Sequence, residues 1–283
     1  VRRLVRMAIW SDGELSEVDV HGINKAKFAL LDMEGVMSFE ANVKDFSQVG
    51  GLHNLKRWLI TRRDAFITED SKLDMPKGIL LLGVQGGGKS LAAKAVAGLW
   101  GLALLRLDIG ALYNKFHGET ERNLREALKL ADAMSPCVIW LDEIEKGMAQ
   151  DGNDNGTSQR LLGTLLTWMA ERKTKVFIVA TSNDISKLPP ELIRKGRLDE
   201  IFFVDLPDVE VRKDIFIIHI NKRNMVASEF DVRKLANATN GFSGSEIEQA
   251  IVAALYTAAA NAQKLTTDIL LQEILNTSPL SVV

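Results

Sequence analysis

Short, continuously apolar runs alternate with longer amphipathic segments through the middle of the chain. A strand that is buried on both faces of a sheet is expected to be apolar without interruption. Five runs of this kind predict strands at residues 78–82, 102–108, 137–141, 175–180 and 201–204. The intervening patterns predict helices near residues 89–99, 119–133 and 157–172. Alternating strands and helices predict an α/β fold with a parallel sheet sandwiched by helices.

The strand pattern stops after Asp208, and only helical patterns follow, near residues 209–222, 232–238, 245–260 and 267–276. The sequence therefore predicts a large α/β domain at residues 39–207, followed by a small α-helical domain at residues 208–283. Residues 18–31 fit one amphipathic helix, and residues 40–51 read as a linker. Residues 1–38 are then a helical extension, or the remnant of an N-terminal domain.

Composition narrows the class of protein. The 283 residues carry a net charge of -2, with 46% hydrophobic and 25% charged side chains, which is typical of a globular protein and not of a disordered one. The balanced charge gives no general basic field for nucleic acid. The single cysteine, Cys137, cannot form an internal disulfide, and it fits a reducing compartment such as the cytoplasm.

No apolar run approaches the ~20 residues that cross a bilayer, so no membrane span is expected. Three arginines near the start lead into only a short apolar stretch, which argues against a signal peptide. The first residue is Val1 and not methionine, so the chain is expected to be a fragment or a trimmed form.

A glycine-rich segment follows the first predicted strand. Residues Gly83–Ser90 read G-V-Q-G-G-G-K-S, which fits the phosphate-binding pattern G-x-x-x-x-G-K-S between a strand and a helix. Glycines let backbone N–H groups surround phosphate oxygens, and the helix N-terminus adds a positive end. Lys89 would reach the β and γ phosphates, and the Ser90 hydroxyl would ligate Mg²⁺. The alternative, a flexible glycine turn, is much weaker in this context.

Polar residues follow two other predicted strands. Asp142 and Glu143 come directly after residues 137–141, so Asp142 would hold Mg²⁺ together with Ser90, and Glu143 would polarise the attacking water. Asn183 follows the next strand, where it would report the γ-phosphate. A solvated acidic turn and a turn-forming asparagine are the respective alternatives.

Two arginines, Arg194 and Arg197, lie three residues apart in L-I-R-K-G-R-L-D. They are either a basic surface patch or arginine fingers that neutralise charge in the transition state of a neighbouring subunit. The residues alone do not separate these two interpretations.

Together, the phosphate loop, V-I-W-L-D-E, T-S-N, L-P-P-E-L-I-R-K-G-R-L-D-E-I-F-F-V-D-L-P and G-F-S-G-S-E-I-E-Q-A-I resemble an AAA-type P-loop ATPase, from about Phe39 to Asn276. L-L-R-L-D-I-G-A-L and R-L-L-G-T-L-L-T-W-M-A-E also resemble the chloroplast reading frame forty-six family of algae, cyanobacteria and other bacteria. This resemblance implies that residues 208–283 form a lid over ATP and Mg²⁺, and that Arg194 and Arg197 are fingers acting in trans.

The resemblance also implies which residues contact the nucleotide. Val49 and Gly50 would border the adenine, His219 would lie near the base and ribose, and Gly244 with Ser245 would form the lid turn. A packed helix histidine is the alternative for His219. The predicted contacts are Val49, Gly50, Gly83, Gln85, Gly86, Gly87, Gly88, Lys89, Ser90, Leu91, His219, Gly244 and Ser245.

A central-pore loop is implied at K-F-H-G-E-T-E. Phe116 falls on the aromatic residue that grips a substrate polypeptide, and His117 and Gly118 flank it. A core aromatic is the alternative, although the polar neighbours favour an exposed loop. Residues 150–156 would be the second pore loop.

The resemblance predicts a homo-oligomeric ring of six that hydrolyses ATP to remodel or disassemble an unidentified protein partner. It also associates the chain with photosynthetic regulation, and with the plastid stroma if the source is an alga. A nucleotide-gated scaffold with slow hydrolysis is one alternative, because Met169-Ala170-Glu171 replaces the common Met-Asp-Gly signalling segment. A nucleic-acid motor is less favoured, given the near-neutral charge and the aromatic pore loop.

Overall fold

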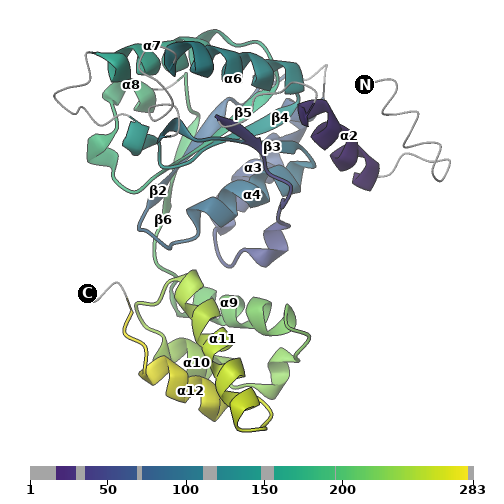
Figure 1. Ribbon diagram of the computed structural model, residues 1–283, viewed down its shortest axis with the longest axis vertical. Coiled ribbons are helices and arrows are strands. Elements are labelled where there is room, and N and C mark those ends of the chain that lie inside the picture. Colours follow the sequence, from purple (N-terminus) through teal and green to yellow (C-terminus); the bar gives the residue numbers. More distant parts are fainter. Residues whose placement is uncertain are drawn as a thin grey trace.

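The structure is a computed structural model that describes residues 17–29, 36–68, 72–110, 120–147, 156–194 and 196–279 (Figure 1). The strands are β1 (Met37–Phe39), β2 (Gly78–Gly83), β3 (Ala103–Leu107), β4 (Cys137–Leu141), β5 (Val176–Ser182) and β6 (Glu200–Val204). The helices around the sheet are α2 (Glu17–Ala29), α3 (His53–Ile67), α4 (Lys89–Trp100), α6 (Thr120–Met134), α7 (Thr157–Glu171) and α8 (Pro190–Ile193). The helices after the sheet are α9 (Val209–Asn221), α10 (Val232–Ala238), α11 (Gly244–Ala260) and α12 (Thr267–Leu275).

The six strands form one sheet in the order β1-β3-β4-β5-β2-β6. The five strands predicted from apolar runs are parallel to one another, which confirms the expected fold class. The sixth strand, β1, corrects the expectation of an entirely parallel sheet, because Met37 pairs antiparallel with Leu107. β1 has only three residues, so it is too short to produce a recognisable periodicity.

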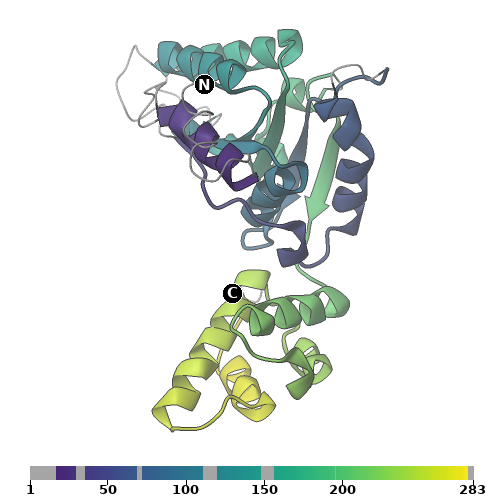
Figure 2. The same ribbon diagram turned by 90° about the vertical axis from the view of Figure 1, so that its right-hand side faces the viewer.

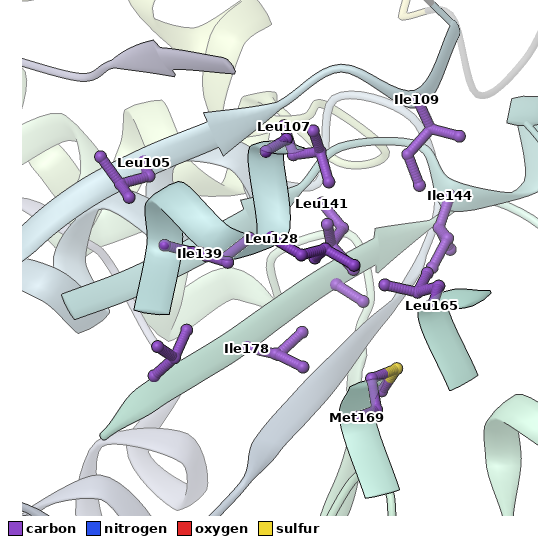
Figure 3. Close-up of a cluster of buried hydrophobic side chains, with 14 of the residues drawn as sticks. Leu105, Leu107, Ile109, Leu128, Ile139, Leu141, Ile144, Leu165, Met169 and Ile178 are labelled. Atoms are coloured by element: carbon purple, nitrogen blue, oxygen red, sulfur yellow. The ribbon is translucent and has the colours of Figure 1, made fainter. Parts of the chain in front are cut away.

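Both faces of the sheet are buried, and alternate residues of each strand point to opposite faces. Ile139 and Ile178 contribute to the apolar core under α6 and α7, while Trp140 and Phe177 contribute to the core under α3 and α4. Figure 3 shows the first of these cores, where Leu128 of α6 and Leu165 of α7 lie over the strands. This double burial explains why most residues of the central strands are apolar.

Helix α3 was not predicted, although it anchors the second core. Phe66 is fully buried and stacks on Trp100 of α4, with ring centroids 5.0 Å apart. The ring of Trp100 in turn packs on that of Phe177 in β5, with ring centroids 4.5 Å apart. The sequence of α3 contains three arginines, and only four of its residues are buried, so its buried stripe is narrow.

The predicted helix at residues 18–31 is observed as α2. Its Lys27 side chain donates a hydrogen bond to the carbonyl of Ala133 at the end of α6 (2.6 Å). The Phe28 ring lies 5.8 Å from that of Phe39 in β1. This helix therefore packs on the sheet domain.

Helices α9–α12 form a separate bundle beyond the end of β6 (Figure 2). They have their own core, in which Phe216, Leu235, Ile251 and Leu270 are fully buried. The all-helical character of the C-terminal part is as predicted. The domain boundaries proposed from the sequence remain predictions.

Candidate functional site

The glycine-rich segment between β2 and α4 adopts a conformation that depends on glycine. A side chain at Gly83 would place its Cβ 1.9 Å from the carbonyl oxygen of Val204 in β6. Gly86 and Gly88 have φ values of +78° and +96°, which other residues rarely adopt. The loop therefore fits tightly between two strands and ends directly at the first turn of α4.

Lys89 is the first residue of α4 and is only 7% exposed. Its ammonium donates hydrogen bonds to the carbonyls of Gly83 (2.8 Å) and Val84 (2.6 Å). An ammonium has three donors, so one remains for another acceptor. Burial lowers the pKa of Lys89, while nearby carboxylates, Glu145 foremost, act in the opposite direction.

The carboxylate of Asp142 lies at the end of β4 and is held on both sides. Thr181 of β5 donates a hydrogen bond from Oγ1 to Asp142 Oδ1 (2.9 Å). Arg106 of β3 donates from Nη2 to Asp142 Oδ2, also at 2.9 Å. The same Thr181 oxygen accepts the backbone N–H of Glu143 (3.0 Å). The ends of three adjacent strands therefore fix the two predicted carboxylates.

Glu143 has a left-handed backbone conformation, with φ +47°. Asn183 donates from its side-chain amide to Glu143 Oε1 (3.1 Å), and Lys146 forms an ion pair with the same carboxylate. The hydrogen bond from Lys146, with a smaller contribution from Asn183, holds the pKa of Glu143 below its usual value. Glu143 is therefore ionised at neutral pH and able to accept a proton.

Glu145, two residues further on, is 6% exposed. Its Oε1 accepts the backbone N–H of Asn183 (3.0 Å), so it holds the residue that contacts Glu143. Glu145 was not among the predicted site residues.

The lid supplies the other wall of the site. The Nδ1 atom of His219 in α9 lies 3.3 Å from Glu248 Oε1 in α11. The same oxygen accepts a hydrogen bond from Arg223 (3.2 Å). Burial lowers the pKa of His219, so the imidazole is neutral at pH 7. The hydroxyl of Ser243 caps α11, and a Cβ added at Gly86 would lie 3.2 Å from this hydroxyl. The phosphate loop and the lid turn are therefore close neighbours.

One cavity of about 1190 Å³ joins these elements. Its walls are the segment around Val49, the phosphate loop, the ends of β4 and β5, and the lid helices α9 and α11. The predicted residues that line it are Val49, Gly50, Gln85, Gly86, Gly87, Gly88, Lys89, Ser90, Leu91, Asp142, Glu143, Asn183, His219, Gly244 and Ser245. Gly83 does not line the cavity, because it is buried where the loop begins. Thr181, Lys222 and Glu248 line it although they were not predicted as site residues.

Ser90 and Asp142 face the same cavity and provide oxygen donors only. This donor set fits Mg²⁺, which takes one or two protein ligands and keeps several waters. Within the described residues, no group of three or more histidine, cysteine or acidic side chains could hold a metal. A site shared with phosphate oxygens is thus the kind of metal site that these residues fit.

Arg194 and Arg197 are not brought to the cavity of their own chain. Their loop lies at the start of β2, where Lys77 donates from Nζ to the carbonyl of Gly196 (2.8 Å) and from its backbone N–H to Asp199 (2.6 Å). The phosphate loop follows the opposite end of this strand, roughly 16 Å away at 3.3 Å per residue. Arg197 itself donates to the carbonyl of Glu191.

The predicted pore residues Phe116, His117 and Gly118 lie outside the described residues, as do residues 150–155 of the predicted second pore loop. Their assignment stays a prediction. No helix in the described ranges is long and apolar enough to span a bilayer.

Comparisons with known proteins identify the family of the chain. Residues 79–206 match the family described as ATPase family associated with various cellular activities (AAA). The chain is 40% identical over 286 residues to the uncharacterized AAA domain-containing protein ycf46 of Guillardia theta, covering 99% of this chain and 56% of that protein. It is 44% identical over 260 residues to the ycf46 protein of Gracilaria tenuistipitata var. liui, and the matched region covers 90% of this chain and 53% of that protein.

A more distant similarity is to the proteasome-activating nucleotidase of Aeropyrum pernix, with 34% identity over 234 residues, or 78% of this chain and 57% of that protein. The chain spans about half the length of the curated relatives that it matches. The family predicted from the sequence motifs is confirmed by these similarities.

Proposed function

Because the chain belongs to the AAA family of ATPases, we propose that it binds ATP with Mg²⁺ in this cavity and hydrolyses it to ADP and phosphate. One observation carries the proposal. The phosphate loop, the two carboxylates after β4, Asn183 and the lid helices all face a single cavity, although they come from distant parts of the sequence. A flexible glycine turn or a solvated acidic turn would not require this convergence.

The chain's own residues have distinct proposed roles. The backbone N–H groups of the phosphate loop and the ammonium of Lys89 bind the β and γ phosphates. Ser90 and Asp142 hold Mg²⁺, which when bound offsets the phosphate charge. Glu143 accepts the proton of the attacking water, and Asn183 orients the Glu143 carboxylate through the hydrogen bond at 3.1 Å.

The adenosine moiety lies between the segment at Val49–Gly50 and the lid. A Cβ at Gly50 would be 2.7 Å from Ile215 of α9, so the two walls approach closely here. His219 and the turn at Gly244–Ser245 complete this part of the cavity. Lid position and nucleotide binding are therefore coupled.

Arg194 and Arg197 are proposed to complete the site of a neighbouring subunit. The start of β2 is too far from the chain's own phosphate loop for these side chains to reach it. Trans completion requires an oligomer, and by family resemblance we propose a ring of six. The name of the proteasome-activating nucleotidase indicates action on a protein assembly, which supports a protein partner that the ring remodels, with Phe116 as the gripping residue.

The first test is ATP hydrolysis per protomer over a wide range of protein concentrations, with Mg²⁺ present. We expect a rate that rises steeply and then saturates, because each site needs a second subunit. Lys89→Ala serves as the control for contaminating ATPases. A constant rate per protomer would contradict trans completion. ATP-dependent assembly without hydrolysis would contradict the ATPase proposal and favour the nucleotide-gated scaffold.

A further inference from the structure

Arg106 of β3 forms an ion pair with the carboxylate that we assign to the metal. Its Nη2 lies 2.9 Å from Asp142 Oδ2, while Asp142 Oδ1 accepts the hydroxyl of Thr181 at the same distance. Both oxygens of Asp142 therefore have a protein partner. The Asp142 side chain is 16% exposed and the Arg106 side chain 40%, so water screens this ion pair only in part.

Arg106 is held at this position by an aromatic ring. It is opposite Trp140 in the register of β3 and β4, and its guanidinium lies 4.9 Å from the centroid of the Trp140 ring. Its Nε is buried without a hydrogen-bond partner among the described residues. The guanidinium is thus directed at Asp142 by stacking on Trp140.

The local charges show what this ion pair does. Asp142, Glu143 and Glu145 all interact electrostatically with Lys89, so three carboxylates gather around the phosphate loop. Lys89, Lys146 and Arg106 oppose them. Without Arg106 the cluster would have one excess negative charge, directly on the proposed metal ligand.

We propose that Arg106 is a positioning residue that sets the affinity of the site for the divalent cation. It offsets the charge of Asp142, so that the cation binds strongly only when nucleotide phosphates contribute the remaining negative charge. This inference rests on the proposed function, because it concerns the same nucleotide site.

The test is the binding of ADP to the full chain, measured by calorimetry in EDTA and at a series of free Mg²⁺ concentrations. ADP avoids turnover, so the readout is binding and not activity. Arg106→Gln and Arg106→Met remove the charge, and the methionine keeps an apolar stem against Trp140. Arg106→Lys keeps the positive charge. Arg122→Gln is the matched control, because it breaks an exposed ion pair with Glu126 (2.9 Å) on α6.

The readout is the free Mg²⁺ concentration that gives half of the full increase in ADP affinity. We expect this concentration to fall about tenfold in both neutral variants, because the positive charge of Arg106 no longer repels the cation. Arg106→Lys and Arg122→Gln should stay within about twofold of the unsubstituted protein. ADP binding with an unchanged or raised Mg²⁺ requirement in the neutral variants overturns the Arg106 proposal alone. Failure of the unsubstituted protein to bind ADP, with or without Mg²⁺, overturns the nucleotide site and this inference with it.

Discussion

Glu143 is the residue whose substitution most directly tests the chemistry. Its carboxylate is positioned by Asn183 at 3.1 Å, and its lowered pKa keeps it ionised at neutral pH. Glu143→Gln preserves size and most hydrogen bonding but cannot accept a proton. We expect hydrolysis to fall about 100- to 10,000-fold, the usual contribution of a general base. ATP binding should persist.

The measurement is single-turnover hydrolysis together with ATP affinity, so that loss of chemistry is separated from loss of binding. Glu126→Gln is a suitable control, because it makes the same chemical change on the exposed surface of α6. Turnover near that of the unsubstituted protein in Glu143→Gln would show that another group takes the proton.

The sequence revealed the site residues that belong to compact motifs, such as Lys89, Asp142 and Glu143. It did not reveal those that act across strands. Thr181 is 39 positions from Asp142, and Arg106 is 36 positions away, so only the folded sheet brings them together. Arg106 did leave a signal, since a single arginine interrupts the apolar run of β3. Glu248 left none, because a glutamate on an exposed helix face is ordinary.

At the scale of elements, the approach of α4 to the segment before α3 is set by one glycine. A Cβ at Gly98 would lie 2.1 Å from the carbonyl oxygen of Lys44, a residue that lines the cavity. Helix propensity alone would make alanine better than glycine inside a helix by about 1 kcal/mol. At Gly98 the clash with the Lys44 carbonyl should make alanine worse than glycine, because either α4 or the segment at Lys44 must move.

Gly98→Ala and Gly163→Ala form a matched pair for this argument. Gly163 lies in α7 with nothing within 4 Å of the added Cβ. We expect Gly163→Ala to stabilise the protein by about 0.5–1 kcal/mol. Gly98→Ala should destabilise it by about 1–3 kcal/mol, as overpacking does. Urea unfolding measures both, and equal stabilisation by the two substitutions would show that the contact at Lys44 is easily relieved.

Elements with strong periodicity were predicted well, and weakly patterned elements were not. β2, β4 and β5 are fully buried and have long apolar runs because helices cover both faces of the sheet, and β3 follows the same pattern apart from Arg106. α3 was missed because its buried positions, among them Leu55, Leu59 and Phe66, are separated by many charged residues. β1 was missed because pairing with β3, and not its own three residues, makes it a strand.

At the scale of the whole molecule, the proposed trans site rests on the position of Arg197. The arginine loop contacts Lys77 at the start of β2, while the phosphate loop follows the other end of that strand. In the proposed function, the chain supplies its arginines to another copy and receives those of a third. A head-to-tail relation of this kind gives a ring, as proposed, or an open helical filament, and not a two-fold dimer.

Mixing two inactive variants tests this relation. Arg197→Ala keeps Glu143 but lacks the finger, and Glu143→Gln keeps the finger but lacks the base. In a randomly mixed ring, a complete site forms where an Arg197→Ala subunit receives the finger of a Glu143→Gln neighbour. At equal amounts this holds for about one interface in four, so we expect about a quarter of the unsubstituted rate. Each variant alone should be nearly inactive, and the rate should rise as subunits exchange.

The control is a mixture of Glu143→Gln with the double variant Arg197→Ala, Glu143→Gln, which has no general base in any subunit. It should give no recovery at any ratio. If mixing the two single variants also gave no recovery, although their subunits exchanged, Arg197 would not act in trans. Its role would then be confined to its own chain, where its side chain already contacts the carbonyl of Glu191.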